Sequence, residues 1–244
     1  MSNSTLWRRA TLFLLAVPLL AAAGCGSSGS AARHPSPSAS TVVTTHACLR
    51  GAGARAQTTG GEQPVEFAEF GTGSRAVVLS NQSDEDLCAW LPFARQMASN
   101  GFRAVVYDYA VAPEQDPITI ASYLRAHGVT AVALMGASQG GKGSIMAATA
   151  MRPAPQAVVT LSAEEHYGGR LIVDYARNEQ APILFVSAAH DAYSAAPAGR
   201  LFDKVAPAKV KRLIIVPGSA HGTALLAQPA VVASVLAFLA AHDR

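Results

Sequence analysis

A serine between two glycines is the first place in this sequence where residue type and spacing indicate chemistry. The segment Gly136-Ala137-Ser138-Gln139-Gly140 follows an apolar run and precedes a helical pattern. A serine hydroxyl is a weak nucleophile unless a base removes its proton and an acid orients that base. His221 and Asp191 can fill these two roles, because each follows a later apolar run. The three residues together predict attack by Ser138 on an acyl group.

The glycines beside Ser138 have a steric purpose. A nucleophile on a tight turn between a strand and a helix has a strained backbone, which lifts its hydroxyl clear of the sheet. Side chains at Gly136 and Gly140 would collide with the adjoining strand and helix. The N-terminus of the helix after Ser138 would also stabilise the negative oxygen that develops during acyl transfer.

The same glycines form most of a phosphate-binding loop. Gly136, Gly141 and Lys142 have the spacing of that motif, but the next residue is Gly143. A Ser or Thr is needed there to bind magnesium. The sequence therefore favours the nucleophile over a nucleotide site, and Lys142 is expected to be a solvated helix residue.

Short apolar runs alternate with helical patterns through residues 46–244. The expected strands are 76–79, 104–107, 131–135, 157–161, 183–187 and 213–216, with one or two edge strands in 63–70. The expected helices are 87–99, 117–127, 139–151, 170–176, 194–205 and 229–242. This alternation predicts a single α/β domain with a mostly parallel sheet and helices on both faces. Ligands bind at the carboxyl ends of the strands in such sheets.

The chain order Ser138, Asp191, His221 and the turn around Ser138 resemble the α/β-hydrolase superfamily, from about residue 62 to the end. The resemblance implies a sheet of about eight strands, with the acid after the last but one strand and the histidine after the last. It implies that His221 takes the Ser138 proton and that Asp191 fixes the imidazole tautomer. The activity that it implies is hydrolysis of carboxylic esters, of small molecules, lipids or polymers, without a cofactor or a metal.

Two backbone N–H groups should bind the negative oxygen in this superfamily. Gln139, directly after the nucleophile, would supply one. The other would come from Gln82, counting from Gly71-Thr72-Gly73, which resembles the family's lead-in. Ser80-Asn81 stands where family members often have His-Gly. A backbone donor requires no particular side chain, so this departure does not remove it.

Caps in this fold usually enter after the strand expected at 157–161, and only residues 162–181 separate it from the next strand. No large cap domain is therefore expected, and the site should be open. Met135, Tyr167 and Tyr193 are candidates to line it, and packing in the core or at the rim would explain each of them as well.

Two alternatives remain open. Related folds can place the acid one strand earlier, where Glu164 and Glu165 lie. The protein could also keep the fold as a surface lipoprotein that binds a ligand or partner without turnover, since a fold alone does not decide function.

Residues 1–24 have the pattern of an export signal. Arg8 and Arg9 precede an apolar run over 10–23, which is too short to anchor a protein comfortably across a bilayer. The run ends in Ala22-Ala23-Gly24-Cys25, which resembles the lipobox of bacterial lipoproteins. Cys25 would then carry the lipid and hold the mature protein on the outer face of the cell membrane.

The rest of the N-terminal region predicts a tether, and the charge balance argues against binding to nucleic acid. Residues 25–45 are rich in Ser, Gly, Ala and Pro, which predicts a flexible tether before a domain at 46–244. Removal of residues 1–24 leaves 17 basic and 16 acidic residues, a balance that gives no nucleic-acid-binding surface. The sequence does not specify an oligomeric state.

The cysteine count predicts one disulfide. Of the three cysteines, Cys25 would carry the lipid, which leaves Cys48 and Cys88. Two thiols in an oxidising compartment tend to pair, so a Cys48–Cys88 bond is expected.

Overall fold

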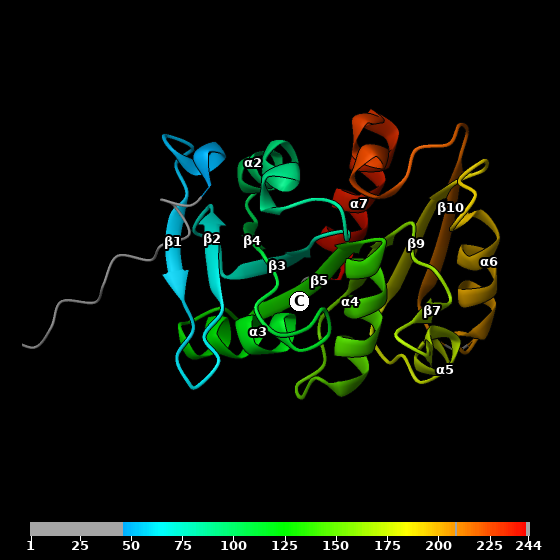
Figure 1. The fold of residues 1–244 in the computed structure, drawn as a ribbon, viewed down its shortest axis with the longest axis horizontal. Coiled ribbons are helices and arrows are strands. Elements are labelled where there is room, and N and C mark those ends of the chain that lie inside the picture. The colour runs from blue at the N-terminus through cyan, green and yellow to red at the C-terminus, as the bar shows by residue number, and fades with distance from the viewer. Residues whose placement is uncertain (1–45, 208, 243–244) are drawn as a thin grey trace, which may run out of the picture. The chain divides into compact units, whose positions relative to one another are not determined.

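The computed structural model describes residues 46–207 and 209–242. Within these residues, eight strands form the central sheet in the order β1-β2-β4-β3-β5-β6-β9-β10 (Figure 1). Strand β2 pairs antiparallel with its two neighbours, and all the other pairs in this sheet are parallel. The predicted mostly parallel sheet of about eight strands is confirmed.

The central strands are β1 (Arg55–Thr58), β2 (Glu66–Phe70), β3 (Arg75–Ser80), β4 (Arg103–Tyr107), β5 (Ala131–Ala137), β6 (Val158–Leu161), β9 (Ile183–Ala188) and β10 (Lys211–Val216). The α-helices are α2 (Leu91–Ser99), α3 (Asp116–Ala126), α4 (Gln139–Ala150), α5 (Ile172–Arg177), α6 (Ala195–Lys204) and α7 (Pro229–Ala241). Three 3₁₀ helices are also found in the described residues: η1 (Ala47–Leu49), η2 (Leu87–Trp90) and η3 (Gly222–Ala227).

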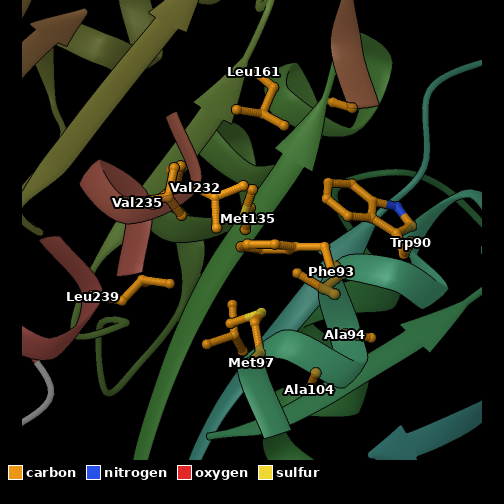
Figure 2. Packing of buried hydrophobic residues seen from close by; sticks show 14 of the residues in the cluster. Trp90, Phe93, Ala94, Met97, Ala104, Met135, Leu161, Val232, Val235 and Leu239 are labelled. Carbon is orange, nitrogen blue, oxygen red and sulfur yellow. The ribbon is translucent and has the colours of Figure 1, made fainter. Parts of the chain in front are cut away.

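Alternating side chains of the strands bury the two faces of the sheet separately. On β3, Val77 and Leu79 pack with α2 and α7, whereas Ala76 and Val78 pack with α3 and α4 on the opposite face. Figure 2 shows the first of these layers, in which Trp90 and residues of α2 and α7 lie together. The helices on both faces leave the carboxyl ends of the parallel strands free to carry a site.

The segment after β6 is short, as expected. It contains a hairpin of two very short strands, β7 (His166–Tyr167) and β8 (Arg170–Leu171), followed by α5. The described residues therefore hold no large cap domain.

Three details differ from the sequence-based expectation. The edge strand next to β2 is β1, which begins before the expected range 63–70. The expected helix 170–176 begins only at Ile172, because Arg170 and Leu171 pair in the hairpin. Strand β10 lies at the other edge, so it is half-exposed rather than buried on both faces.

The predicted signal segment 1–24, the lipidated Cys25 and the tether over 25–45 lie outside the described residues. Within the described part of the chain, no helix is both long and apolar enough to span a membrane.

Candidate active site

Ser138 occupies a strained turn between β5 and α4. Its φ of 46° and ψ of −109° lie outside the regions that side-chain-bearing residues normally adopt. The Ser138 N–H donates to the Leu161 carbonyl of β6 at 2.7 Å, which ties the turn to the neighbouring strand. Strain of this kind persists only where the surroundings impose it, and it is typical of functional sites.

The glycines of the turn are needed for close main-chain packing. A Cβ at Gly136 would collide with the Gly140 carbonyl, and one at Gly140 would collide with the carbonyl of Ser80. A Cβ at Gly143, the position that lacks the phosphate-loop Ser or Thr, would collide with Pro113. The first turn of α4 is thus pressed onto the loop that follows β3, so Gln139 and that loop lie side by side.

His221 and Asp191 are in direct contact. Asp191 follows β9, His221 follows β10, and the His221 Nδ1 lies 2.8 Å from the Asp191 Oδ2. Backbone bonds join the two loops: the Ala189 N–H donates to Val216 and the His190 N–H to Gly218, at 2.8 and 2.9 Å. The pairing of β9 with β10 therefore sets the position of the imidazole.

Asp191 is held as a buried carboxylate. Burial alone would raise its pKa, but hydrogen bonds from Ser194, the Tyr193 N–H, His221 and Ser162 outweigh burial and lower the pKa below its usual value. The Ser194 Oγ donates to the Asp191 Oδ2 at 2.6 Å. An ionised Asp191 can orient His221 and stabilise its protonated form.

Ser138 does not hydrogen-bond to His221 in this structure. Its Oγ donates instead to the Glu164 Oε1 at 3.4 Å. No partner of the His221 Nε2 is found in the part of the chain that the structure describes, so this nitrogen is free to accept the hydroxyl proton. Catalytic hydrogen bonds are often poorly aligned before substrate binds.

Lys142 is not the solvated residue that the sequence suggested. Its side chain is 9% exposed, and its Nζ lies 3.3 Å from the Glu164 Oε2. The Tyr167 ring is 5.8 Å from the same nitrogen. Lys142 lies one helical turn after Ser138, and its backbone N–H donates to the Ser138 carbonyl. The sequence missed this pair because the partner lies on a loop far along the chain.

The loop after β3 lies against the loop that carries His221. The Gln82 Oε1 accepts from the Thr223 N–H at 3.1 Å, and the Thr223 hydroxyl donates to the Glu85 carboxylate at 2.6 Å. Gly222 has a φ of +56°, and a Cβ there would collide with the Gln82 side chain. The backbone N–H groups of Gln82 and Gln139 donate to no acceptor among the described residues, so both can bind a negative oxygen.

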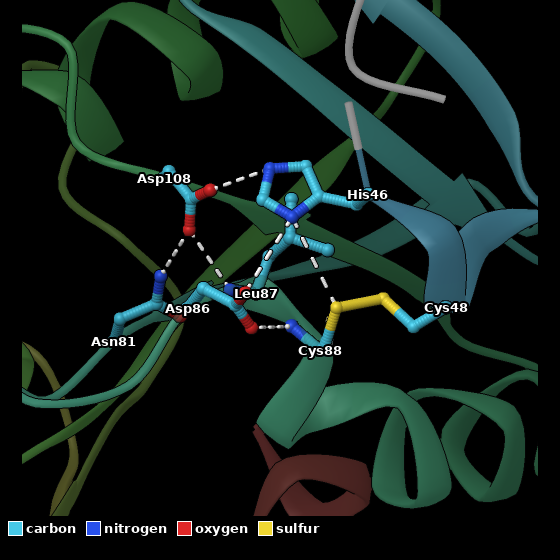
Figure 3. The surroundings of a disulfide bond; sticks show 7 residues. All are labelled: His46, Cys48, Asn81, Asp86, Leu87, Cys88 and Asp108. Carbon is cyan, nitrogen blue, oxygen red and sulfur yellow. Dashed lines mark hydrogen bonds and ion pairs between the residues drawn. A yellow bond between two sulfur atoms is a disulfide. The ribbon is translucent and has the colours of Figure 1, made fainter. Parts of the chain in front are cut away.

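A network of polar side chains fixes the loop that contains Gln82 (Figure 3). The Asp108 Oδ1 accepts from the Asn81 side chain and from the Leu87 N–H, both at 2.8 Å. The other oxygen of Asp108 pairs with the His46 Nε2 at 2.8 Å. One carboxylate therefore holds both ends of residues 81–87.

The structure joins Cys48 and Cys88 in a disulfide at the end of this loop. His46, Asp86 and Cys88 lie close enough together to be considered as metal ligands. A cysteine binds metals as a free thiolate, however, and Cys88 is in the disulfide.

Of the other residues that the sequence suggested, Tyr193 lies beside His221, whereas Met135 and Glu165 do not reach the site. Tyr193 is 69% exposed and its ring lies edge-on to the His221 imidazole, with centroids 5.9 Å apart. Met135, in contrast, is fully buried between α2 and α7 and does not line the site (Figure 2). The sequence could not show this, because a strand buried on both faces gives no sign of which side chains reach its open end. Glu165 points away to Arg200, which donates from its Nε at 2.8 Å and lowers the pKa of the carboxyl.

Three buried serines beside the site were missed by the sequence analysis. Ser187 and Ser194 share a hydrogen bond of 2.7 Å behind Asp191. Ser162 has a φ of 55°, and its Oγ accepts from the Gly222 N–H at 2.9 Å. Serine is common throughout the chain, so the only signal in the sequence was position: Ser162 directly follows β6, Ser187 lies within β9, and Ser194 directly precedes α6.

The sequence matches no protein-family model, and a search of curated proteins finds no match. Solved structures do match the fold. A Paleococcus ferrophilus monoacylglycerol lipase is 17% identical, with a TM-score of 0.62 over 73% of this chain and 99% of the lipase. A putative lipase from Acinetobacter baumannii is 10% identical, with a TM-score of 0.67 over 87% of this chain and 99% of that one.

This chain has the α/β-hydrolase fold. A Mycobacterium smegmatis proline iminopeptidase matches it at a TM-score of 0.64 and 12% identity, over 77% of this chain and 98% of the peptidase. The α/β-hydrolase fold thus spans neighbours named for different reactions. The reaction must be argued from the residues of the site.

Proposed function

We propose that this protein is a serine hydrolase that cleaves carboxylic esters through an acyl-enzyme on Ser138. The observation that carries the proposal is the contact of 2.8 Å between His221 and the buried Asp191, at the sheet edge where Ser138 stands on its strained turn. A buried carboxylate bonded to one imidazole nitrogen leaves the other nitrogen as a base.

The reaction would use the atoms as follows. The Ser138 Oγ attacks the ester carbonyl while its proton passes to the His221 Nε2, and Asp191 stabilises the imidazolium. The N–H groups of Gln139 and Gln82 bind the tetrahedral oxyanion. The carbon–oxygen bond then breaks, and the leaving alkoxide takes the proton from His221. Water then attacks the acyl-enzyme while one of its protons passes to the His221 Nε2. The bond between the acyl carbon and the Ser138 Oγ breaks, His221 returns this proton to the Oγ, and the acid is released.

Asp191 is a better orienting acid than either glutamate after β6. Glu165 is engaged by Arg200 and Glu164 by Lys142, whereas the Asp191 carboxylate bonds to the imidazole itself.

The test is covalent labelling with a fluorophosphonate probe, followed by assays with esters of graded chain length and with a matched anilide. Ser138→Ala is the control. Labelling of the wild type alone, together with ester hydrolysis, is the expected result. Equal labelling of both proteins, or of neither, would refute the hydrolase and leave a binding lipoprotein of the same fold.

We also infer that the protein is exported and anchored to the cell membrane through a lipid on Cys25. Support comes from the signal pattern at residues 1–24 and from the Cys48–Cys88 disulfide, since such bonds persist in oxidising compartments. An anchored enzyme with no large cap would suit lipid or polymer esters as well as small ones.

A further inference from the structure

Glu164 and Lys142 form a charged pair beside the nucleophile, and the proposed triad does not use them. Glu164 has its Oε2 on the Lys142 ammonium, while its Oε1 accepts the Ser138 hydroxyl. The Lys142 side chain is nine-tenths buried, whereas that of Glu164 is 30% exposed. The carboxylate is therefore the member of the pair that faces a bound molecule.

Acylation of Ser138 removes the hydrogen-bond donor of the Glu164 Oε1. The Ser138 Oγ becomes an ester oxygen and carries no hydrogen, while Lys142 still occupies the Oε2. A carboxylate oxygen left without a donor is costly once a bound substrate keeps water from it. The scissile carbonyl carbon is then bonded to the Ser138 Oγ. Substrate groups attached near that carbon would therefore lie beside the Glu164 Oε1, where the Ser138 hydrogen had been.

We propose that Glu164 and Lys142 are specificity-determining residues, which select esters with a hydroxyl group next to the scissile carbonyl. The proposal rests on the proposed ester hydrolysis at Ser138. The hydroxyl donates to the Glu164 Oε1 when the Ser138 hydrogen is gone. It comes from a hydroxy acid on the acyl side, which stays bound in the acyl-enzyme. On the alcohol side it comes from a diol or polyol, which can donate only in the tetrahedral intermediate, after the Ser138 proton has passed to His221 and before the alcohol leaves.

The charged groups around Glu164 favour a neutral hydroxyl over an ammonium group as the part of the substrate that binds there. Lys142 already neutralises Glu164 at 3.3 Å. The Arg170 guanidinium, 5.3 Å from the Tyr167 ring centroid, is itself paired with Glu114. A substrate ammonium at the Glu164 Oε1 would stand close to the Lys142 ammonium. An alkyl group would leave the Oε1 without a donor, so an apolar chain at this place should be rejected.

The test compares paired esters in which a hydroxyl replaces a methyl group. Ethyl lactate against ethyl isobutyrate probes the acyl side, and ethylene glycol monoacetate against propyl acetate probes the alcohol side. Each pair gives a ratio of kcat/KM for the wild type and for a variant. Dividing the two ratios cancels the intrinsic reactivity of the esters.

The variant with Glu164→Leu and Lys142→Met removes the carboxylate without leaving a buried ammonium unpaired. We expect it to lower the hydroxyl preference about tenfold or more in one of the two pairs, as for a lost hydrogen bond to a charged group. Glu164→Gln, which keeps an amide oxygen, should lower the preference less. Glu165→Gln is the matched control and should change nothing, since Glu165 bonds to Arg200.

Four results would overturn the proposal. An unchanged preference in both glutamate variants would show that Glu164 does not select the hydroxyl. Equal loss of activity of Glu164→Gln toward all four esters would make Glu164 part of the triad instead. If the wild type hydrolyses none of the esters and is not labelled at Ser138, the proposed function fails and this proposal fails with it. Labelling and hydrolysis without a hydroxyl preference would refute only the specificity.

Discussion

Loss of the Cys48–Cys88 disulfide should lower both the stability of this protein and its turnover. The bond closes a loop with a sequence separation of 40 residues. In the chain-entropy account this contributes about 4 kcal/mol to the free energy of unfolding. For a domain of this size, a loss of about 4 kcal/mol corresponds to a fall in Tm of about 8–16 °C.

The effect on turnover follows from what the disulfide holds. Cys88 directly follows Leu87, whose N–H bonds to Asp108, and His46 pairs with the same carboxylate from the other side of the bond (Figure 3). Without the disulfide, the segment around His46 is released and residues 81–87 lose one of their supports. The Gln82 N–H would then be less well aimed at the oxyanion, and kcat should fall about tenfold, part of the loss expected for removing one such donor.

The assay is thermal unfolding and ester hydrolysis of the variant Cys48→Ser with Cys88→Ser, at saturating substrate. Asp108→Asn is the companion variant, because it keeps the disulfide but weakens the pairing with His46. It should lower kcat with a smaller change in Tm. Thiol titration of the unfolded, unreduced wild type gives the direct check. Two free thiols at Cys48 and Cys88, or a double variant with unchanged Tm and kcat, would refute the reasoning.

Further perturbations test other parts of the molecule. Asp191→Asn should fold normally and reduce kcat about 10³–10⁴-fold through the wrong imidazole tautomer; near-full activity there, with Glu164→Gln inactive, would move the acid one strand earlier. Burial raises the pKa of Glu179 from 4.5 to about 6. The folded state therefore binds more protons than the unfolded state between these values, and the free energy of unfolding should fall by about 2 kcal/mol as pH rises through this window. Glu179→Gln should abolish this fall in urea titrations at several pH values, and an identical pH profile of the variant would contradict it. Cys25→Ser should abolish incorporation of labelled fatty acid and release the protein from membranes, and unchanged membrane retention would count against the lipobox.

The sheet could be predicted from the sequence because its strands are short, apolar and separated by helices. Each parallel strand except the edge strand β10 is buried by helices on both faces, so its run of apolar residues is visible without knowledge of its neighbours. The strands that the sequence did not predict lack such a run of buried apolar residues. Strand β1 and the hairpin β7–β8 are short and partly exposed, so they leave no such run.

The sequence could predict those site residues whose role depends on their immediate neighbours in the chain. It could not predict those whose role depends on contacts with residues elsewhere in the sequence. The glycines around Ser138 follow from the steric demands of one turn, and the sequence shows them directly. The burial of Lys142 depends on Glu164, which belongs to another connection. The serines behind Asp191 and His221 are defined only by what they touch. The roles of Ser138, Asp191 and His221 stay predictions until the labelling experiment is done.

The contact between Gln82 and Gly222 couples the changes that these two loops can undergo during evolution. The Gln82 amide occupies the space that a Cβ at position 222 would need. A side chain at position 222 would force that amide to move, and the φ of +56° at Gly222 adds a further cost. Movement of the amide would in turn break its bond to the Thr223 N–H. Descendants of this protein that change position 222 should therefore also carry a change in the loop of Gln82.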